Sequence, residues 1–145
     1  MSWQSWHTYG YGVRITELQS VSMEKVMELV QTAPKYAEGL NEWLHDCEID
    51  NPTLDDLIDY DENFHIGLAS LLSEVIEERE GIRLTACDDL DGHTYLLYEQ
   101  TYPWRMTDLE KSLKEEDIQS LLAKYLSQIT EEIIIVDYYE PENGG

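Results

Sequence analysis

The chain has 145 residues and is 42% hydrophobic, which is the size and composition of one ordinary folded domain with a real core. Its 31 acidic and 9 basic residues give a formal net charge of −22, far beyond the magnitude of about 2 to 8 that suffices for solubility. Such a charge excludes direct binding to nucleic acid and to anionic membranes, and it favours basic proteins, basic peptides or metal cations as partners. We expect a single acidic domain over residues 1–145.

Composition also indicates a folded protein in a reducing compartment. Disordered acidic chains have few aromatic residues, whereas this one has 4 Trp and 10 Tyr. Two cysteines beside apolar residues, Cys47 and Cys87, do not suggest a disulfide framework. Neither a signal peptide nor an apolar run approaching the roughly 18 residues of a membrane span is evident. We therefore expect a cytoplasmic protein.

The first predicted elements are a strand and a helix. Residues from Trp6 to Ile15 alternate large and small side chains, which is typical of a half-buried strand. Gly10 and Gly12 fall on its other face, where they indicate a bulge, a close approach of another backbone or a flat patch under another side chain. Ser22 is a suitable N-cap for a helix that ends near residue 32.

An acidic stretch begins with the second helix, which Pro34 is suited to start. Between Tyr36 and Glu78 the chain has thirteen Asp and Glu residues and no Lys or Arg. The predicted buried face of this helix consists of Tyr36, Leu40, Trp43, Leu44 and Cys47. Glu38, Glu42 and Asp46 lie on another face at spacings of four, where like charges cost about 0.2 to 0.5 kcal/mol per pair. This stripe is harder to explain by helix stability than by recognition.

The middle of the acidic stretch is predicted to be a short helical turn followed by an acidic loop. Its acids are Asp55, Asp56, Asp59, Asp61 and Glu62. A purely structural explanation is that negative charge here favours the N-terminus of the next helix. That helix is predicted over Asn63 to Glu80 from its apolar period of 3.6 residues, and Gly81 is predicted to end it.

The second half of the chain predicts a hairpin, two helical segments and a strand. Residues 82–88 and 93–99 are strand-like and are joined by a turn that ends in Asp91 and Gly92. Thr107 and Glu110 have capping-box spacing, a helix is predicted over 115–128, and a β-branched strand over 132–139. The order β, helical block, β, β, α, β predicts an α+β fold with an antiparallel sheet of about four strands and helices on one face.

The sequence contains only weak signs of a metal site or a catalytic site. The two stretches that resemble calcium loops, at residues 59–70 and 87–98, lack the required glycine or terminal ligands, and His45 with Cys47 is too small a set for zinc. No nucleophile elbow, phosphate-binding loop or zincin helix occurs. We predict no catalytic residues, no metal and no cofactor. An enzyme alternative places a metal-assisted or acid/base hydrolase site at the hairpin turn, with Asp88, Asp89, Asp91 and His93.

The favoured hypothesis is a non-enzymatic protein that binds a basic surface of another protein. Its predicted contacts are Glu38, Glu42, Asp46, Asp55, Asp56, Asp59, Asp61 and Glu62. Aromatic residues near the strand and the loop after the hairpin belong either to the core or to a binding surface: Trp3, Trp6, Tyr9, Tyr11, Tyr102 and Trp104. An immunity or antitoxin-like protein for a basic toxin shares these electrostatics and differs only in its partner.

Three segments carry a family resemblance: WHTYGYGVRI, ACDDLDGHTYLLYEQTYPW and the terminal ENGG. They resemble small acidic proteins carried by bacterial prophages and other mobile elements, a group that brings no established activity. As a class, a compact and strongly acidic protein also resembles DNA-mimic inhibitors, among them anti-restriction and anti-CRISPR proteins. That likeness implies a basic nucleic-acid-binding enzyme as the partner, with carboxylates in place of phosphates.

Overall fold

The computed structural model describes residues 6–60, 67–99 and 103–144. Its helices are α1 (Met23–Gln31), α2 (Pro34–Asp46), α3 (Leu54–Tyr60), α4 (Leu68–Glu80), α5 (Asp108–Ser112) and α6 (Glu115–Leu126). Its strands are β1 (Trp6–His7), β2 (Gly10–Arg14), β3 (Thr85–Asp88), β4 (Thr94–Tyr98), β5 (Asp137–Tyr139) and β6 (Glu142–Gly144). Short 3-10 turns occupy Ile15–Glu17 and Pro103–Arg105. No helix in these ranges is both long enough and apolar enough to cross a lipid bilayer.

The main sheet has four antiparallel strands in the order β3-β4-β2-β5, which confirms the predicted α+β class. The two glycines of β2 explain how β4 can lie so close to it. A Cβ atom at Gly10 or Gly12 would collide with the main-chain oxygen of Tyr98 or Leu96. The predicted close backbone approach is therefore confirmed, and any larger residue at these positions must displace a neighbouring strand.

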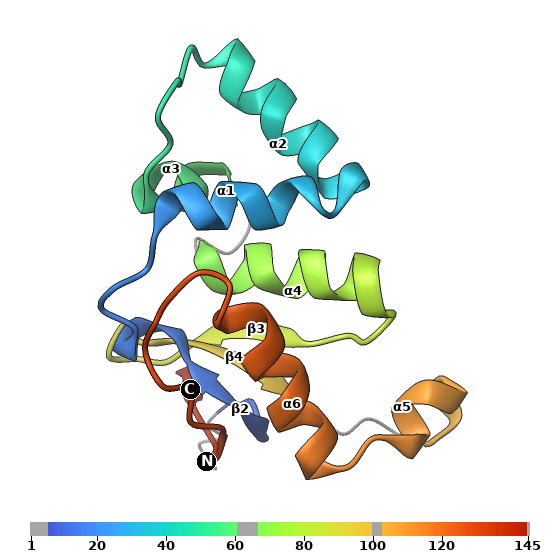
Figure 1. Cartoon of the computed structure of the whole chain (residues 1–145). Coiled ribbons are helices and arrows are strands. Elements are labelled where there is room, and N and C mark those ends of the chain that lie inside the picture. Colours follow the sequence, from blue (N-terminus) through green and yellow to red (C-terminus); the bar gives the residue numbers. More distant parts are fainter. Residues whose placement is uncertain (1–5, 61–66, 100–102, 145) are drawn as a thin grey trace.

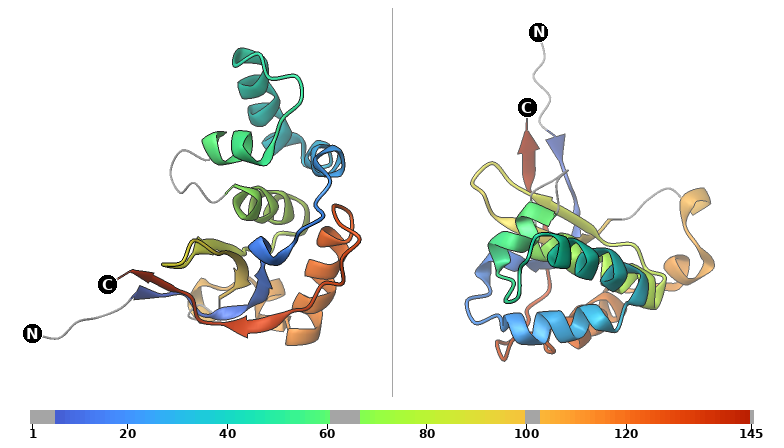
Figure 2. Two further views of the ribbon diagram at one scale, coloured as in Figure 1. Left: turned by 90° about the vertical axis from the view of Figure 1, so that its left-hand side faces the viewer. Right: turned by 90° about the horizontal axis from the view of Figure 1, so that it is seen from above.

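The helices form two layers over one face of the sheet (Figures 1 and 2). α4 packs on β3 and β4, and α6 packs on β2, while α1, α2 and α3 lie beyond α4. One buried cluster runs through all three layers, with fully buried side chains such as Leu40 of α2, Leu72 of α4 and Leu122 of α6. The other face of the sheet has a small cluster of Cys87, Tyr95 and Leu97. Among the described residues, the outer helices therefore rest on the sheet mainly through α4.

Most predicted helix ends are confirmed by their capping contacts. The Ser22 hydroxyl accepts a hydrogen bond from the Lys25 N–H, and Pro34 is the first residue of α2. Gly81 ends α4 in the left-handed conformation that glycine adopts without strain. Thr107 and Glu110 form the predicted capping box. Local side-chain chemistry thus sets these boundaries as the spacing indicated.

Four predictions are corrected by the structure. The helix predicted over Asn63 to Glu80 begins at Leu68, because Gly67, with a φ of 69°, is its N-cap, and residues 61–66 lie outside the described ranges. The strand over residues 6–15 is split, because β1 pairs with β6 while only β2 joins the main sheet. The strand over residues 132–139 pairs only from Asp137, which lies opposite Gly12, because the last two residues of β2, Val13 and Arg14, pair with β4 alone among the described strands. Cys47 is exposed rather than buried, because α2 ends at Asp46 and Cys47 is its C-cap.

Candidate interaction surface

Many acidic residues have a structural role as acceptors for backbone N–H groups. Glu78 of α4 accepts hydrogen bonds from the N–H groups of Lys35 and Tyr36, at 3.0 and 2.9 Å, and so caps the start of α2. Glu132 accepts from the N–H groups of Gln19 and Ser20, and these contacts lower its pKa. These carboxylates are needed by the fold and are not free to bind a partner.

The acids predicted to bind a partner fall into three groups. Glu38, Glu42 and Asp46 on α2 and Asp55 and Asp59 on α3 are exposed, and none has a hydrogen bond or ion pair with another residue in the described ranges. A second group is Asp56 alone, which is half-buried and accepts from the N–H and the hydroxyl of Thr53, at 2.7 and 3.1 Å. Asp61 and Glu62 lie outside the described residues.

Aromatic contacts hold α3 against α2 and so bring the two acidic segments into one layer. The ring of Tyr60 lies 5.3 Å from that of Trp43 and 6.2 Å from that of Tyr36, measured between centroids. Burial, reinforced by the charge of Glu74, raises the pKa of Tyr60, so its hydroxyl stays protonated. The aromatic contacts therefore hold the acidic helices α2 and α3 together at one end of the molecule (Figure 1).

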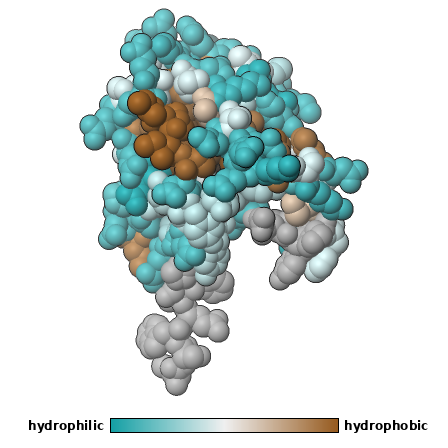
Figure 3. All heavy atoms as spheres, turned by 60° about the horizontal axis from the view of Figure 1, so that its bottom comes forward, coloured by the Kyte–Doolittle hydropathy of each residue, from teal (hydrophilic) through white to brown (hydrophobic). Residues whose placement is uncertain are grey.

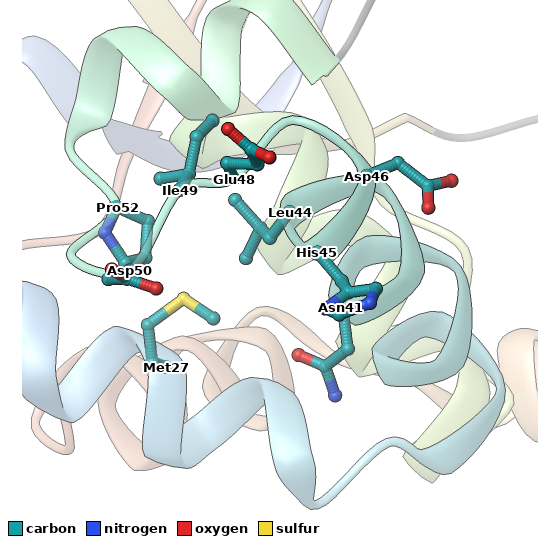
Figure 4. Close-up of a pocket in the computed structure, with 9 residues that line it drawn as sticks. All are labelled: Met27, Asn41, Leu44, His45, Asp46, Glu48, Ile49, Asp50 and Pro52. Atoms are coloured by element: carbon teal, nitrogen blue, oxygen red, sulfur yellow. The ribbon is translucent and has the colours of Figure 1, made fainter.

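A groove of about 820 Å³ opens between α1, the end of α2 and the loop that follows α2. We call it the α1–α2 groove, and its lining residues are Met27, Asn41, Leu44, His45, Asp46, Glu48, Ile49, Asp50 and Pro52. Figure 4 shows Met27 rising from α1 toward the opposite wall, and the Asp46 carboxylate pointing away from the cavity. Paired amide hydrogen bonds of 3.3 and 3.0 Å between Gln31 and Asn41 join the two helices at one end.

The groove combines an apolar floor with an acidic rim. Leu44 is buried, while Met27, Ile49 and Pro52 are half-buried, so apolar surface faces the opening. Three exposed acids lie on the rim, Asp46, Glu48 and Asp50, and of these the carboxylate of Asp46 points outward, away from the cavity. A second apolar hollow of about 540 Å³ adjoins it across Met27 and Pro52 and is also lined by Met23, Glu24 and Glu28. The surface is suited to a ligand with apolar and cationic parts.

Glu48 is the one residue other than glycine among the described residues that has a positive φ angle, 56°. It follows the C-cap of α2, and its N–H donates to the His45 carbonyl while the Ile49 N–H donates to the Leu44 carbonyl. This double hydrogen bond is a Schellman motif, in which glycine is the usual residue at the left-handed position. A carboxylate is thus held on the rim at a backbone position that disfavours it by about 1 to 2 kcal/mol.

Sequence reasoning selected only one residue of this groove, Asp46. It did not select Glu48 and Asp50, because they follow the end of α2 and do not continue the four-residue spacing of its acidic stripe. It did not select Met27 either, because the periodicity of α1 assigns this residue to the buried face. The Schellman motif could have been suspected from the apolar Ile49, because such a contact commonly follows the helix end. Nothing in the linear pattern indicates that α1 faces this loop.

The hairpin turn proposed as an enzyme site is organised around Asp89 as a structural acceptor. One oxygen of Asp89 accepts from the N–H groups of Asp91 and His93, and the other accepts from the Tyr95 hydroxyl at 2.7 Å. Burial acts to raise the pKa of Asp89, but these hydrogen bonds outweigh it and lower that pKa. A cavity of about 270 Å³ lies beside the turn, where the Arg14 guanidinium sits 5.5 Å above the Tyr95 ring. Both carboxylate oxygens of Asp89 are therefore already engaged.

Comparisons supply no relative from which a site could be transferred. No family model matches the chain, and neither the curated proteins nor the solved structures include a match. Within the ranges that the structure describes, no group of three or more His, Cys, Asp or Glu side chains is placed to hold a metal ion. The functional argument therefore rests on the geometry of this chain alone.

Proposed function

We propose that this chain is a non-enzymatic interaction protein whose acidic outer helices bind a basic surface of another protein. The observation that carries the proposal is the contrast between acids that accept hydrogen bonds inside the fold and those of α2 and α3 that do not. Glu38, Glu42 and Asp46 form a stripe along α2, and none of the three forms an ion pair with another described residue. A basic partner would remove the mutual repulsion of these carboxylates, so association is electrostatically favoured.

The α1–α2 groove would supply the apolar part of the contact. Lys and Arg side chains have apolar stems and charged heads, so the stems would pack on Met27 and Ile49 while the heads reach the rim carboxylates. Methionine adapts its shape to varied partners and is common at binding surfaces of this kind. Glu48 supports a binding role, since the fold alone would be better served by glycine at that position.

In its more specific form, the proposal is a DNA mimic that acts in the cytoplasm on a nucleic-acid-binding enzyme such as a restriction or CRISPR nuclease. The carboxylates of α2 and α3 would stand in for backbone phosphates and occupy the groove that normally holds nucleic acid. A likeness to proteins of prophages and mobile elements would fit such a partner. The immunity or antitoxin form of the proposal shares the same surface and replaces the nuclease with a basic toxin.

The test is a competition assay with purified restriction and CRISPR nucleases. We expect the wild-type chain to reduce DNA cleavage by a susceptible nuclease, with inhibition that weakens as salt rises from about 50 to 200 mM, because screening shortens the range of the charges. The triple variant Glu38→Gln, Glu42→Gln, Asp46→Asn should lose most of this inhibition.

A matched variant separates a specific surface from total charge. Asp108, Glu115 and Glu116 are exposed and have no side-chain partner among the residues described, so replacing them by Asn, Gln and Gln removes the same charge elsewhere. This control should inhibit as the wild type does. Equal loss in both variants, or no inhibition and no retained nuclease even at low salt, would mean that the α2 stripe is not a recognition surface.

A further inference from the structure

The segment before β5 exposes apolar side chains to an unusual degree for so acidic a protein. Ile133 and Ile135 are 88% and 71% exposed. Figure 3 shows a hydrophobic patch on a largely hydrophilic face of the molecule. Ile133 and Ile135 adjoin the half-buried Ile134 and Val136 in the chain, so residues 133–136 present a run of apolar side chains. Contiguous apolar surface on a soluble protein commonly marks a place where another molecule binds.

The backbone of this segment is extended but unpaired. Its side chains alternate, with Ile134 and Val136 packed against the core and Ile133 and Ile135 facing outward, which is the pattern of a strand. No N–H or C=O group from Ile133 to Val136 has a hydrogen-bond partner among the described residues. The segment continues β5, the edge strand of the main sheet. It is therefore an edge on which further strand pairing can occur.

The edge is protected at one end and open at the other. At Tyr138 the outward N–H donates to the Asp137 carboxylate at 2.8 Å, so this side chain occupies the position that a partner strand would take. No such contact shields residues 133–136. Since Ile134 and Val136 anchor the open part to the core, it is held extended before any partner arrives, and ordering it costs little.

We propose that residues 133–136 form an acceptor edge for an extended segment of another protein, with apolar residues at alternate positions and Lys or Arg at its ends. Main-chain hydrogen bonds would supply affinity, and Ile133 and Ile135 would select apolar side chains. Glu131 and Asp137 bracket the apolar run, so basic flanks on the partner would lie opposite acids. This inference does not rest on the proposed function, because it concerns a different element and a different mode of binding.

A second copy of the chain is a poor occupant of the same edge. In the antiparallel register that pairs residues 133–136 with themselves, Glu132 of one copy would lie opposite Asp137 of the other, at both ends of the pair. Like charges directly opposite each other are destabilising in a sheet, and each copy carries a net charge of −22. A strand with Lys or Arg at its ends avoids both the opposed like charges and the repulsion between two acidic chains.

The experiment uses a labelled synthetic peptide of about ten residues, with alternating Val and Thr between pairs of Lys, a length typical of a strand. We expect binding by fluorescence anisotropy and amide chemical-shift changes at residues 133–139 of the ¹⁵N-labelled chain. The double variant Ile133→Ser, Ile135→Ser should weaken binding by about tenfold, a change of about 1.4 kcal/mol. Both residues are exposed, so the variant is expected to fold.

Three controls define what would overturn the proposal. A peptide with Gly and Ser between the same lysines tests charge alone, and a peptide N-methylated at every residue between the lysines cannot pair as a strand through either edge. The variant Leu90→Ser, Leu109→Ser removes exposed apolar side chains elsewhere and should bind as the wild type does. Equal binding of all peptides, shifts confined to the α1–α2 groove, or absence of binding would each overturn it. So would a dimer by sedimentation velocity that the Ile133→Ser, Ile135→Ser variant abolishes.

Discussion

The acids of the sheet and those of the outer helices contribute differently to the same net charge. Around the sheet, several carboxylates are bound by partners: Glu110 by Arg83 at 2.8 Å, Glu80 by Lys124 at 2.8 Å, and Glu99 by the Thr85 hydroxyl at 2.6 Å. Others there, such as Glu115 and Glu116 of α6, are exposed and have no such bond among the described residues. On α2 and α3, Asp56 is the one predicted contact that has such a bond among the described residues. Net charge alone therefore says little about function, whereas the subset of acids without an internal role says more.

The largest effect expected from a single substitution is loss of Glu110. Its buried carboxylate accepts hydrogen bonds from two Arg83 nitrogens and from the Thr107 N–H. We expect Glu110→Ala to lower the free energy of unfolding in urea by about 2 to 3 kcal/mol, because charged hydrogen bonds and a helix cap are lost together. If Glu110→Ala cost no more than an alanine at Glu38, the distinction between the two sets of acids would fail.

The pH dependence of stability should show the same contrast. The hydrogen bond from Arg83 is the main cause that holds the pKa of Glu110 below its ordinary value. A lowered folded-state pKa contributes stability above the unfolded-state pKa of about 4.3, and this stability is lost as pH falls through the folded value. The difference in unfolding free energy between wild type and Glu110→Gln should therefore be full near pH 6 and shrink below about pH 4. If the difference stayed constant to low pH, the ion pair between Glu110 and Arg83 would not be its cause.

Glu48→Gly is expected to stabilise the fold. Glycine adopts the left-handed conformation without the strain imposed on Glu48, so the free energy of unfolding should rise by about 1 kcal/mol in urea titrations. If the α1–α2 groove binds a basic partner, the same variant should also bind it more weakly. A variant that is less stable than the wild type would show that Glu48 has a structural role after all.

A smaller stabilisation is expected from Glu42→Gln. Glu42 lies four residues from both Glu38 and Asp46, so the substitution removes two repulsive pairs and should add about 0.5 kcal/mol at low salt. Thermal unfolding at low and at high ionic strength provides the check, because a gain from relieved repulsion disappears when the charges are screened. A gain that persists in high salt would have another cause.

Much of the architecture follows from local chemistry that the sequence displays. Ser22, Pro34, Gly81 and the Thr107 capping box each act through neighbours a few residues away, so spacing alone locates them. The turn at residues 89–92 is also local. Gly92 has a φ of 84°, which glycine adopts readily, and its N–H donates to the Asp89 carbonyl within the turn. These elements are predictable because their hydrogen bonds are short-range.

What the sequence did not predict depends on contacts between distant segments. Glu78 caps a helix more than forty residues earlier in the chain, and only the packing of α4 against α2 brings it there. The β-branched run at 133–136 has the composition of a strand, yet β2 pairs with the C-terminal segment only from Gly10 to Gly12, so the run has no partner strand among the described residues. The α1–α2 groove is of this type as well, since Met27 and Ile49 meet only in the folded chain.

The position of Cys47 offers a chemical handle on the proposed site. Its thiol is exposed at the end of α2, between the rim residues Asp46 and Glu48, whereas Cys87 is buried in the sheet. A maleimide dye added to the folded protein should react first at Cys47 and leave Cys87 intact. The natural sequence thus accepts an environment-sensitive fluorophore beside the groove, where arrival of a partner would change the emission without any engineered cysteine.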